Sequence, residues 1–121
     1  MKMKMKLFDT SALIEQLQRG FFERGAISVV TLVEVLRGVP QEKRIKVKNL
    51  IEEAYDVLGI DNDVILKYCE IYMTLKRRGQ IMPDADALIA ATAMARGLTL
   101  VTRDRDFERL IDLNLKLELK S

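Results

Sequence analysis

Acidic residues recur in this sequence where an apolar strand ends or a helix begins. The four leading ones are Asp9, Glu34, Asp86 and Asp104. In an open parallel sheet the carboxyl ends of the strands share one edge, and ligands bind there, so we expect these carboxylates to converge. Like charges ~4 Å apart repel by about 4 kcal/mol at an effective dielectric constant of about 20. A bound cation would relieve that repulsion.

The absence of histidine narrows the chemistry further. The 121 residues contain no His, which excludes Ser-His-Asp and Cys-His mechanisms, His-based cleavage of RNA and His-containing zinc sites. Carboxylate oxygens without imidazole or thiolate partners select Mg²⁺ or Mn²⁺. These ions turn a bound water into a nucleophile and stabilise the phosphoryl oxygens during in-line displacement.

The four acids also have structural interpretations. Asp9 and Asp104 suit a helix cap or a turn, and Glu34 completes a capping box that begins at Thr31. Each structural interpretation is plausible by itself. Three of the four acids fall at the carboxyl end of a predicted strand, and this joint placement favours a shared site.

Two further acids are expected to support the site. Asp84 is predicted to cap a helix from Ala85 to Arg96, while Asp86 projects from the positive end of that helix, ready to bind a cation. Asp106 is predicted to cap a short turn that follows Asp104.

Composition is that of an ordinary globular chain, and we expect a single domain over residues 1–121. Apolar residues make up 49%, charged residues 31%, and the formal net charge is +2. If several acids share one pocket, the remaining surface is basic and suits a polyanion. The lone Cys69 excludes an internal disulfide and, among apolar neighbours, predicts a buried, inert thiol.

The chain is expected to be cytoplasmic and to have no membrane contact. The basic opening from Met1 to Lys6 is followed too soon by Asp9 for a signal peptide, and no other apolar run is long enough to span a bilayer.

Strands alternate with helices along the sequence, which predicts an α/β fold with a parallel sheet between helices. Apolar runs predict strands at 4–8, 26–30, 55–60 and 98–102, and an alternating edge strand at 113–119. Helices are expected at 12–19 and from 31 to about 36, then over a stripe formed by Ile45, Leu50, Ile51 and Ala54, and from a cap at 61–63 to about 78.

One predicted helix has an apolar face that is too broad for a single sheet contact. The face comprises Ile65, Tyr68, Cys69, Tyr72 and Met73. An exposed patch of that extent is an aggregation risk. We therefore expect a homodimer that buries part of the segment from Val64 to Leu75.

Four ordered motifs resemble those of the PIN domain, and in length and order those of VapC-type toxins of toxin-antitoxin pairs. The motifs are Leu7-Phe8-Asp9-Thr10-Ser11-Ala12-Leu13-Ile14, Glu34-Val35-Leu36-Arg37-Gly38, Pro83-Asp84-Ala85-Asp86 with the following 87–93, and Leu100-Val101-Thr102-Arg103-Asp104-Arg105-Asp106-Phe107. The resemblance implies a three-layer α/β/α sandwich with strand order 3-2-1-4-5. It also implies a metal-dependent ribonuclease whose catalytic and metal-binding residues are Asp9, Glu34, Asp86 and Asp104, with hydrogen-bonding support from Ser11 and Thr102.

The same resemblance implies an RNA substrate and a cognate antitoxin. Arg37, Arg103 and Arg105 lie next to the proposed ligands in sequence and could hold RNA phosphates. Three alternatives remain: a PIN nuclease of RNA maturation or quality control without an antitoxin, a Mg²⁺-binding phosphoacceptor signalling domain, and a binding module without activity. The signalling domain requires adjacent acids after the first strand, whereas Asp9 is single. Retention of all four acids argues against an inactive module.

Overall fold

A five-stranded parallel sheet organises the computed structural model, which describes residues 5–121. Its strands are β1 (Lys6–Phe8), β2 (Ala26–Ser28), β3 (Asp56–Leu58), β4 (Thr99–Thr102) and β5 (Lys116–Leu119). They lie in the order β3-β2-β1-β4-β5, and every neighbouring pair is parallel. This confirms the expected fold class and strand order.

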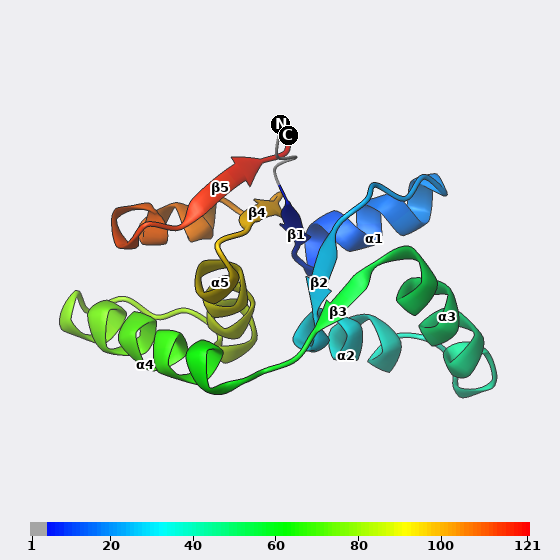
Figure 1. Cartoon of the computed structure of the whole chain (residues 1–121), viewed down its shortest axis with the longest axis horizontal. Helices are drawn as coiled ribbons and strands as arrows, with labels where there is room; N and C mark the ends of the chain where they lie inside the picture. Colours follow the sequence, from blue (N-terminus) through cyan, green and yellow to red (C-terminus); the bar gives the residue numbers. More distant parts are fainter. Residues whose placement is uncertain (1–4) are drawn as a thin grey trace.

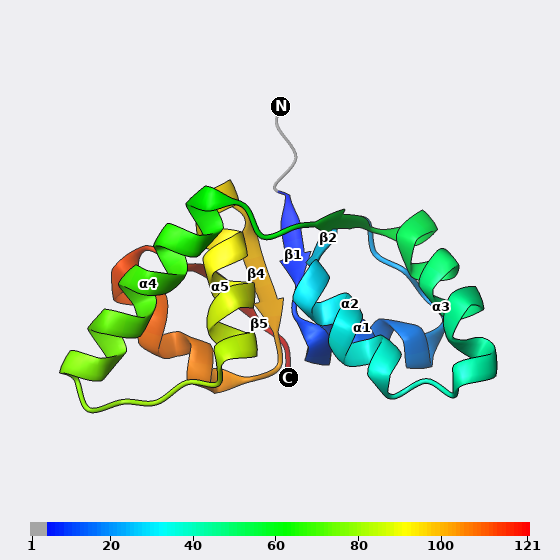
Figure 2. The ribbon, with the colours of Figure 1, turned by 90° about the horizontal axis from the view of Figure 1, so that it is seen from below.

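Helices cover both faces of the sheet (Figures 1 and 2). One face carries α1 (Thr10–Arg19), α2 (Val29–Arg37) and α3 (Gln41–Ala54), and the other carries α4 (Asn62–Arg77), α5 (Asp84–Arg96) and the 3₁₀ helix η1 (Arg105–Leu113). None of the helices in residues 5–121 has the length and apolar character needed to cross a bilayer.

Successive residues of the short central strand β1 pack into the hydrophobic cores on opposite faces of the sheet, because side chains alternate across a strand. Leu7 packs with α4, α5 and η1, whereas Phe8 packs with α1, α2 and α3. Both side chains are fully buried. The strand therefore fixes the position of the residue that follows it, Asp9, from two sides.

Most strands are shorter than the apolar runs that predicted them. Val29 and Val30 belong to α2, because the Ser28 side chain accepts a hydrogen bond from the Val30 N–H at 3.0 Å and starts the helix there. The predicted first strand included Lys4, which lies outside the described residues.

The predicted cap of α4 is confirmed at Asp61, whose carboxylate accepts from the Val64 N–H at 3.0 Å. Two other expectations are wrong. Ile45 and Leu50 are exposed, and Ile51 is the one fully buried residue of α3, so the packed stripe is narrower than predicted. Cys69 lies on the outer side of α4 and is exposed.

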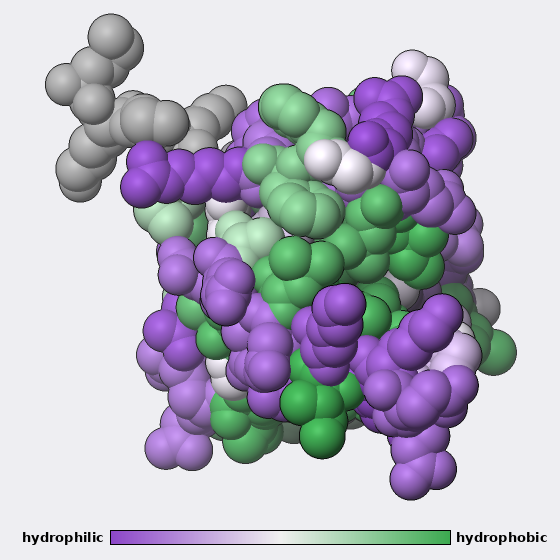
Figure 3. Space-filling model, turned by 90° about the vertical axis from the view of Figure 1, so that its right-hand side faces the viewer, coloured by the Kyte–Doolittle hydropathy of each residue, from purple (hydrophilic) through white to green (hydrophobic). Residues whose placement is uncertain are grey.

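The side of the molecule on which α3 lies carries a band of hydrophobic residues between charged ones (Figure 3). Because α3 uses little of its apolar surface to cover the sheet, part of that surface remains in contact with solvent. The carboxyl ends of the strands lie apart from this apolar band, at the edge of the sheet where α1, α2 and α5 begin.

Candidate active site

Asp9 is the most firmly held acid of the site. Its carboxylate caps α1 by accepting from the Ala12 N–H at 2.9 Å, and it also accepts from the hydroxyls of Ser11, at 2.7 Å, and Thr102. Its own N–H donates to the Val101 carbonyl at 3.0 Å. Only 4% of Asp9 is exposed, and this burial raises the pKa of its carboxyl, although the three hydrogen bonds oppose the shift. The Asp9 side chain therefore both caps α1 and contributes a carboxylate to the candidate site.

Glu34 reaches the site from the second turn of α2. The expected capping box is absent, because Ser28 caps this helix and Thr31 lies buried inside it. The Glu34 carboxylate instead accepts from the Thr10 hydroxyl at 2.6 Å, across the gap between α1 and α2. Arg37 lies 3.8 Å away on the same helix.

Asp104, rather than Asp106, caps η1. Asp104 has an extended backbone and caps η1, accepting from the Asp106 N–H at 2.9 Å. The expectation that Asp106 is the cap is therefore wrong, and its carboxylate lies 3.4 Å from Arg109. The Asp104 N–H donates to the Thr102 hydroxyl at 2.9 Å, which connects this loop to Asp9.

The start of α5 also differs from the prediction. Pro83 precedes the first helical residue, and Asp84 makes no capping hydrogen bond. The Asp84 carboxylate instead accepts from the Tyr68 hydroxyl at 2.6 Å, and this bond is the main reason that the pKa of Tyr68 rises to about 12. Asp86 lies in the first turn of α5, as expected.

The other leading acids lie near enough to Asp86 for their charges to act on it. Burial, followed by the negative charges of Glu34, Asp104, Asp9 and Asp106, raises the pKa of Asp86 to about 6. The structure thus brings together all four leading acids predicted from the sequence, from α1, α2, α5 and the loop after β4. Their oxygens are the hard ligands that Mg²⁺ and Mn²⁺ prefer. Within residues 5–121, however, no three acidic or Cys side chains already stand as ligands of a single ion.

The three predicted RNA-binding arginines are placed differently. Arg103 pairs with Glu15 of α1 at 2.8 Å, and its N–H donates to the Ser11 hydroxyl at 3.1 Å, so it is held at the site. Arg37 lies beside Glu34. Arg105 pairs with Glu108 along η1 at 3.1 Å and is largely exposed.

Three residues that shape the site were missed at the level of sequence. Thr10 orients Glu34, Glu15 pairs with Arg103, and Tyr68 holds Asp84. Spacing offers a signal for one of them: Ser11 and Glu15 are one helical turn apart and therefore share a face. The other two contacts join residues that are distant in sequence.

Comparison with known proteins identifies the family of this chain. Residues 6–113 match the family model of the PIN domain. Ribonuclease VapC1 of Methanocaldococcus jannaschii is 37% identical over 115 residues, which cover 92% of this chain and 85% of that protein. The tRNA(fMet)-specific endonuclease VapC of Salmonella typhimurium is 30% identical over 98 residues, covering 77% of this chain and 74% of that protein.

Solved structures share the fold. A chain in the crystal structure of DNA-bound VapBC from Salmonella typhimurium has a TM-score of 0.83 at 26% identity and covers 96% of this chain and 98% of its own length. VapBC-1 from nontypeable Haemophilus influenzae gives a TM-score of 0.81 at 23% identity, with coverage of 95% and 97%. Because the family model spans most of the sequence and includes all four acids, this chain belongs to the PIN-domain family.

Proposed function

We propose that this protein is a Mg²⁺- or Mn²⁺-dependent endoribonuclease of the VapC type. The observation that carries the proposal is the convergence of Asp9, Glu34, Asp86 and Asp104, in which neighbouring negative charges help to raise the pKa of Asp86. The ribonuclease and endonuclease names of the relatives support the substrate class.

Three of the four acidic residues have a distinct task in this proposal. Asp9 is immobilised by its three hydrogen bonds and gives the site a fixed oxygen donor. Glu34 is held by Thr10, and Asp86 would release its proton when a cation binds. When bound, Mg²⁺ or Mn²⁺ would supply an activated water and neutralise charge on the phosphodiester. Mg²⁺ keeps several of its waters in proteins, so the carboxylates need not all touch the ion.

Cleavage of single-stranded RNA tests the proposal. The purified protein should cut RNA with Mg²⁺ or Mn²⁺, lose activity in EDTA and leave 5′-phosphates, because water rather than the 2′-hydroxyl attacks. Asp9→Asn and Asp86→Asn should be folded but inactive. Cleavage that persists in EDTA, 2′,3′-cyclic products or full activity of Asp9→Asn would show that the mechanism is wrong.

We also propose that the protein is the toxin of a toxin-antitoxin pair. Several solved structures with this fold are described as VapBC, including a VapBC family member of toxin-antitoxin systems from Mycobacterium tuberculosis. An antitoxin could place an Arg against Asp9, Glu34 and Asp86, since a guanidinium pairs well with clustered carboxylates.

Inducible expression in a bacterial host separates a toxin from a nuclease of RNA maturation. Wild type alone should arrest growth, Asp9→Asn should not, and a small protein encoded beside the gene should relieve the arrest. Equal toxicity of both forms, or no toxicity from an active enzyme, would favour the maturation nuclease.

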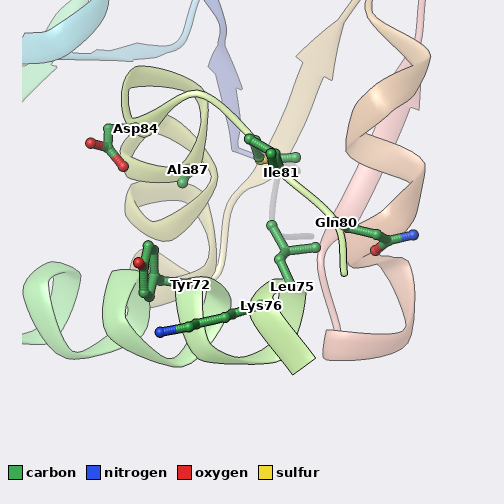
Figure 4. A pocket seen from close by; sticks show the side chains of 8 residues that line it. Tyr72, Leu75, Lys76, Gln80, Ile81, Asp84 and Ala87 are labelled. Carbon is green, nitrogen blue, oxygen red and sulfur yellow. The ribbon is translucent and has the colours of Figure 1, made fainter. Parts of the chain in front are cut away.

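A homodimer through α4 is the third part of the proposal. Its outer face keeps Ile65, Leu66, Tyr72 and Met73 exposed, as the broad apolar pattern predicted. Beside this face lies a cavity of about 240 Å³, into which Tyr72 and Leu75 project from α4 toward α5 (Figure 4). Ile81, also at this cavity, is 87% exposed. A second copy of the chain would cover this continuous apolar surface.

A further inference from the structure

The segment between α4 and α5, residues 78–83, leads directly into the helical turn that carries Asp86 (Figure 4). We call it the α4–α5 connection. The side chain of Ile81 in this connection is 87% exposed and anchors it little. The Ile81 carbonyl, however, accepts a hydrogen bond from the Arg109 guanidinium at 2.7 Å. An arginine of η1 therefore holds the backbone that precedes α5.

A second arginine makes this contact reciprocal. Arg78, at the C-terminal end of α4, donates to the Arg109 carbonyl at 3.2 Å and pairs with Asp112. The Arg78 and Arg109 side chains are 35% and 30% exposed, so both lie mostly against protein and are screened less than a fully exposed pair. The α4–α5 connection is thus joined to η1 at two points.

The same guanidinium group also faces the acidic cluster. It lies 3.4 Å from the Asp106 carboxylate, whose charge is one of those that act on Asp86. The Asp106 N–H in turn donates to the Asp104 carboxylate at 2.9 Å. Because a guanidinium presents several N–H donors in a fixed fork, Arg109 can connect the turn that contains Asp104 to the backbone that leads to Asp86.

Asp86 depends on such support more than Asp9 does. Three hydrogen bonds fix the Asp9 carboxylate, whereas burial and neighbouring negative charges dominate the pKa of Asp86. Because like charges repel, Asp86 stays close to the other carboxylates only if its backbone is held there. The bond from Arg109 supplies one part of that restraint, and Tyr68, through Asp84, supplies another.

We propose that Arg109 is a positioning residue of the candidate active site. It holds the α4–α5 connection against η1 and so keeps Asp86 where it can share a cation with Asp104. The inference rests on the proposed metal-dependent function and deepens it, because it assigns the placement of one ligand to a residue outside the cluster of carboxylates.

Titration calorimetry with Mn²⁺ alone tests this placement. Arg109→Gln should weaken Mn²⁺ binding roughly tenfold, the lower end of the loss that follows removal of groups that orient metal ligands. Removal of a positive charge beside a cation site would by itself strengthen binding, so a pure charge effect has the opposite sign. Unchanged or tighter Mn²⁺ binding by Arg109→Gln would overturn the proposal.

Arg96→Gln is the matched control, because it removes the same charge and also breaks a link between α4 and α5. Arg96 pairs with Asp61 where α4 begins and α5 ends. This pair lies roughly 18 Å along α5 from its first residue, at about 1.5 Å per residue. Mn²⁺ affinity should be unchanged in Arg96→Gln. An equal loss in both variants would show that general loosening of the two helices weakens binding, and would exclude a specific role of Arg109.

Hydrogen–deuterium exchange of the metal-free protein locates the effect. The first bond of α5 runs from the Ala87 N–H to the Pro83 carbonyl at 3.0 Å. In Arg109→Gln the amides of residues 80–88 should exchange faster, while those of residues 11–14, at the start of α1, should keep their wild-type protection. Faster exchange in both segments would indicate general destabilisation and contradict a positioning role.

Failure of the positioning role and failure of the ribonuclease function give different results. Wild type that binds Mn²⁺ but does not cut RNA, together with weaker Mn²⁺ binding by Arg109→Gln, would refute the ribonuclease proposal alone. Wild type that cuts RNA, together with normal Mn²⁺ binding by Arg109→Gln, would refute the positioning role alone.

Discussion

At the scale of the residue, one hydroxyl group connects two helices of the candidate site. The Thr10 hydroxyl donates to Glu34 at 2.6 Å and lies 3.3 Å from the Thr31 hydroxyl. Thr10→Val keeps the shape of the side chain and removes the donor. We expect Mn²⁺ binding and RNA cleavage to weaken about tenfold, because a hydrogen bond to a charged group contributes about 1.5–3 kcal/mol.

Thr10→Ser is the conservative control and should restore both properties. Titration calorimetry measures Mn²⁺ binding, and a cleavage assay measures RNA cleavage. If Thr10→Ser were as impaired as Thr10→Val at an unchanged Tm, orientation of Glu34 by the hydroxyl would not explain the loss.

The raised pKa of Asp86 leads to a second prediction, on the pH dependence of stability. In the metal-free folded protein its pKa is raised from 3.8 to about 6. Between these values the folded state keeps a proton that the unfolded chain has lost, so the contribution of Asp86 to stability is present at low pH and falls as pH rises. Asp86→Asn should therefore raise the Tm in EDTA above about pH 7, and have little effect near pH 4.

Scanning calorimetry at the two pH values measures this change, with Glu53→Gln on α3 as a control of equal charge. Because protons compete with cations for the same oxygen atoms, Mn²⁺ binding by wild type should weaken below about pH 6. A Tm gain of the same size at both pH values would contradict the ionisation of Asp86 as its cause.

Residue types and spacing were sufficient to predict that the four acids lie near one another, but not the bonds that orient them. Asp9 and Asp104 are helix caps that also lie near Asp86, so the structural and functional interpretations are compatible. The partners of Glu34 and Asp84 come from other helices. Such contacts depend on how helices pack, which local sequence does not specify.

At the scale of the element, Gly25 allows β1 and β2 to approach. A Cβ atom at this position would lie 2.6 Å from the Phe8 ring and 2.8 Å from the Lys6 carbonyl oxygen. The carbonyl belongs to the neighbouring strand and cannot move freely. We expect Gly25→Ala to destabilise the fold by about 1–3 kcal/mol, as overpacked cores do.

Thermal unfolding measures this change, and Gly59→Ala is the matched control because no atom lies within 4 Å of its added Cβ. Since 1 kcal/mol shifts the Tm by roughly 2–8 °C, the difference between the two variants should be easily resolved. Equal melting temperatures would show that β1 and β2 can separate without penalty.

The existence and type of most elements followed from hydrophobic periodicity, whereas their first residues often did not. Ser28 and Thr31 are both good capping residues, and only the packed position of β2 decides that the helix starts at Val29. The exposure of Cys69 has a similar origin. Its helix turns Val64, Ile71 and Leu75 to the core, which leaves the opposite apolar side outside.

At the scale of the whole molecule, the exposed face of α4 predicts the oligomeric state. Wild type should be a dimer at micromolar concentration, and Tyr72→Glu should be a folded monomer, because a charge would have to be buried in the interface. Light scattering measures the mass, and Ile45→Glu on α3 is the control. A wild-type monomer, or a dimer that Tyr72→Glu leaves intact, would exclude this interface.

The arrangement of the sheet has a consequence for synthesis of the protein. Asp9 and Glu34 come from the first third of the chain, whereas Asp86 and Asp104 come from its last third, and β1 gains β4 as a neighbour only after residue 102 has been made. A nascent chain that still lacks its last strands can hold no complete set of carboxylates. A ribosome that makes this protein would therefore be exposed to any activity of the assembled site only once translation is nearly finished.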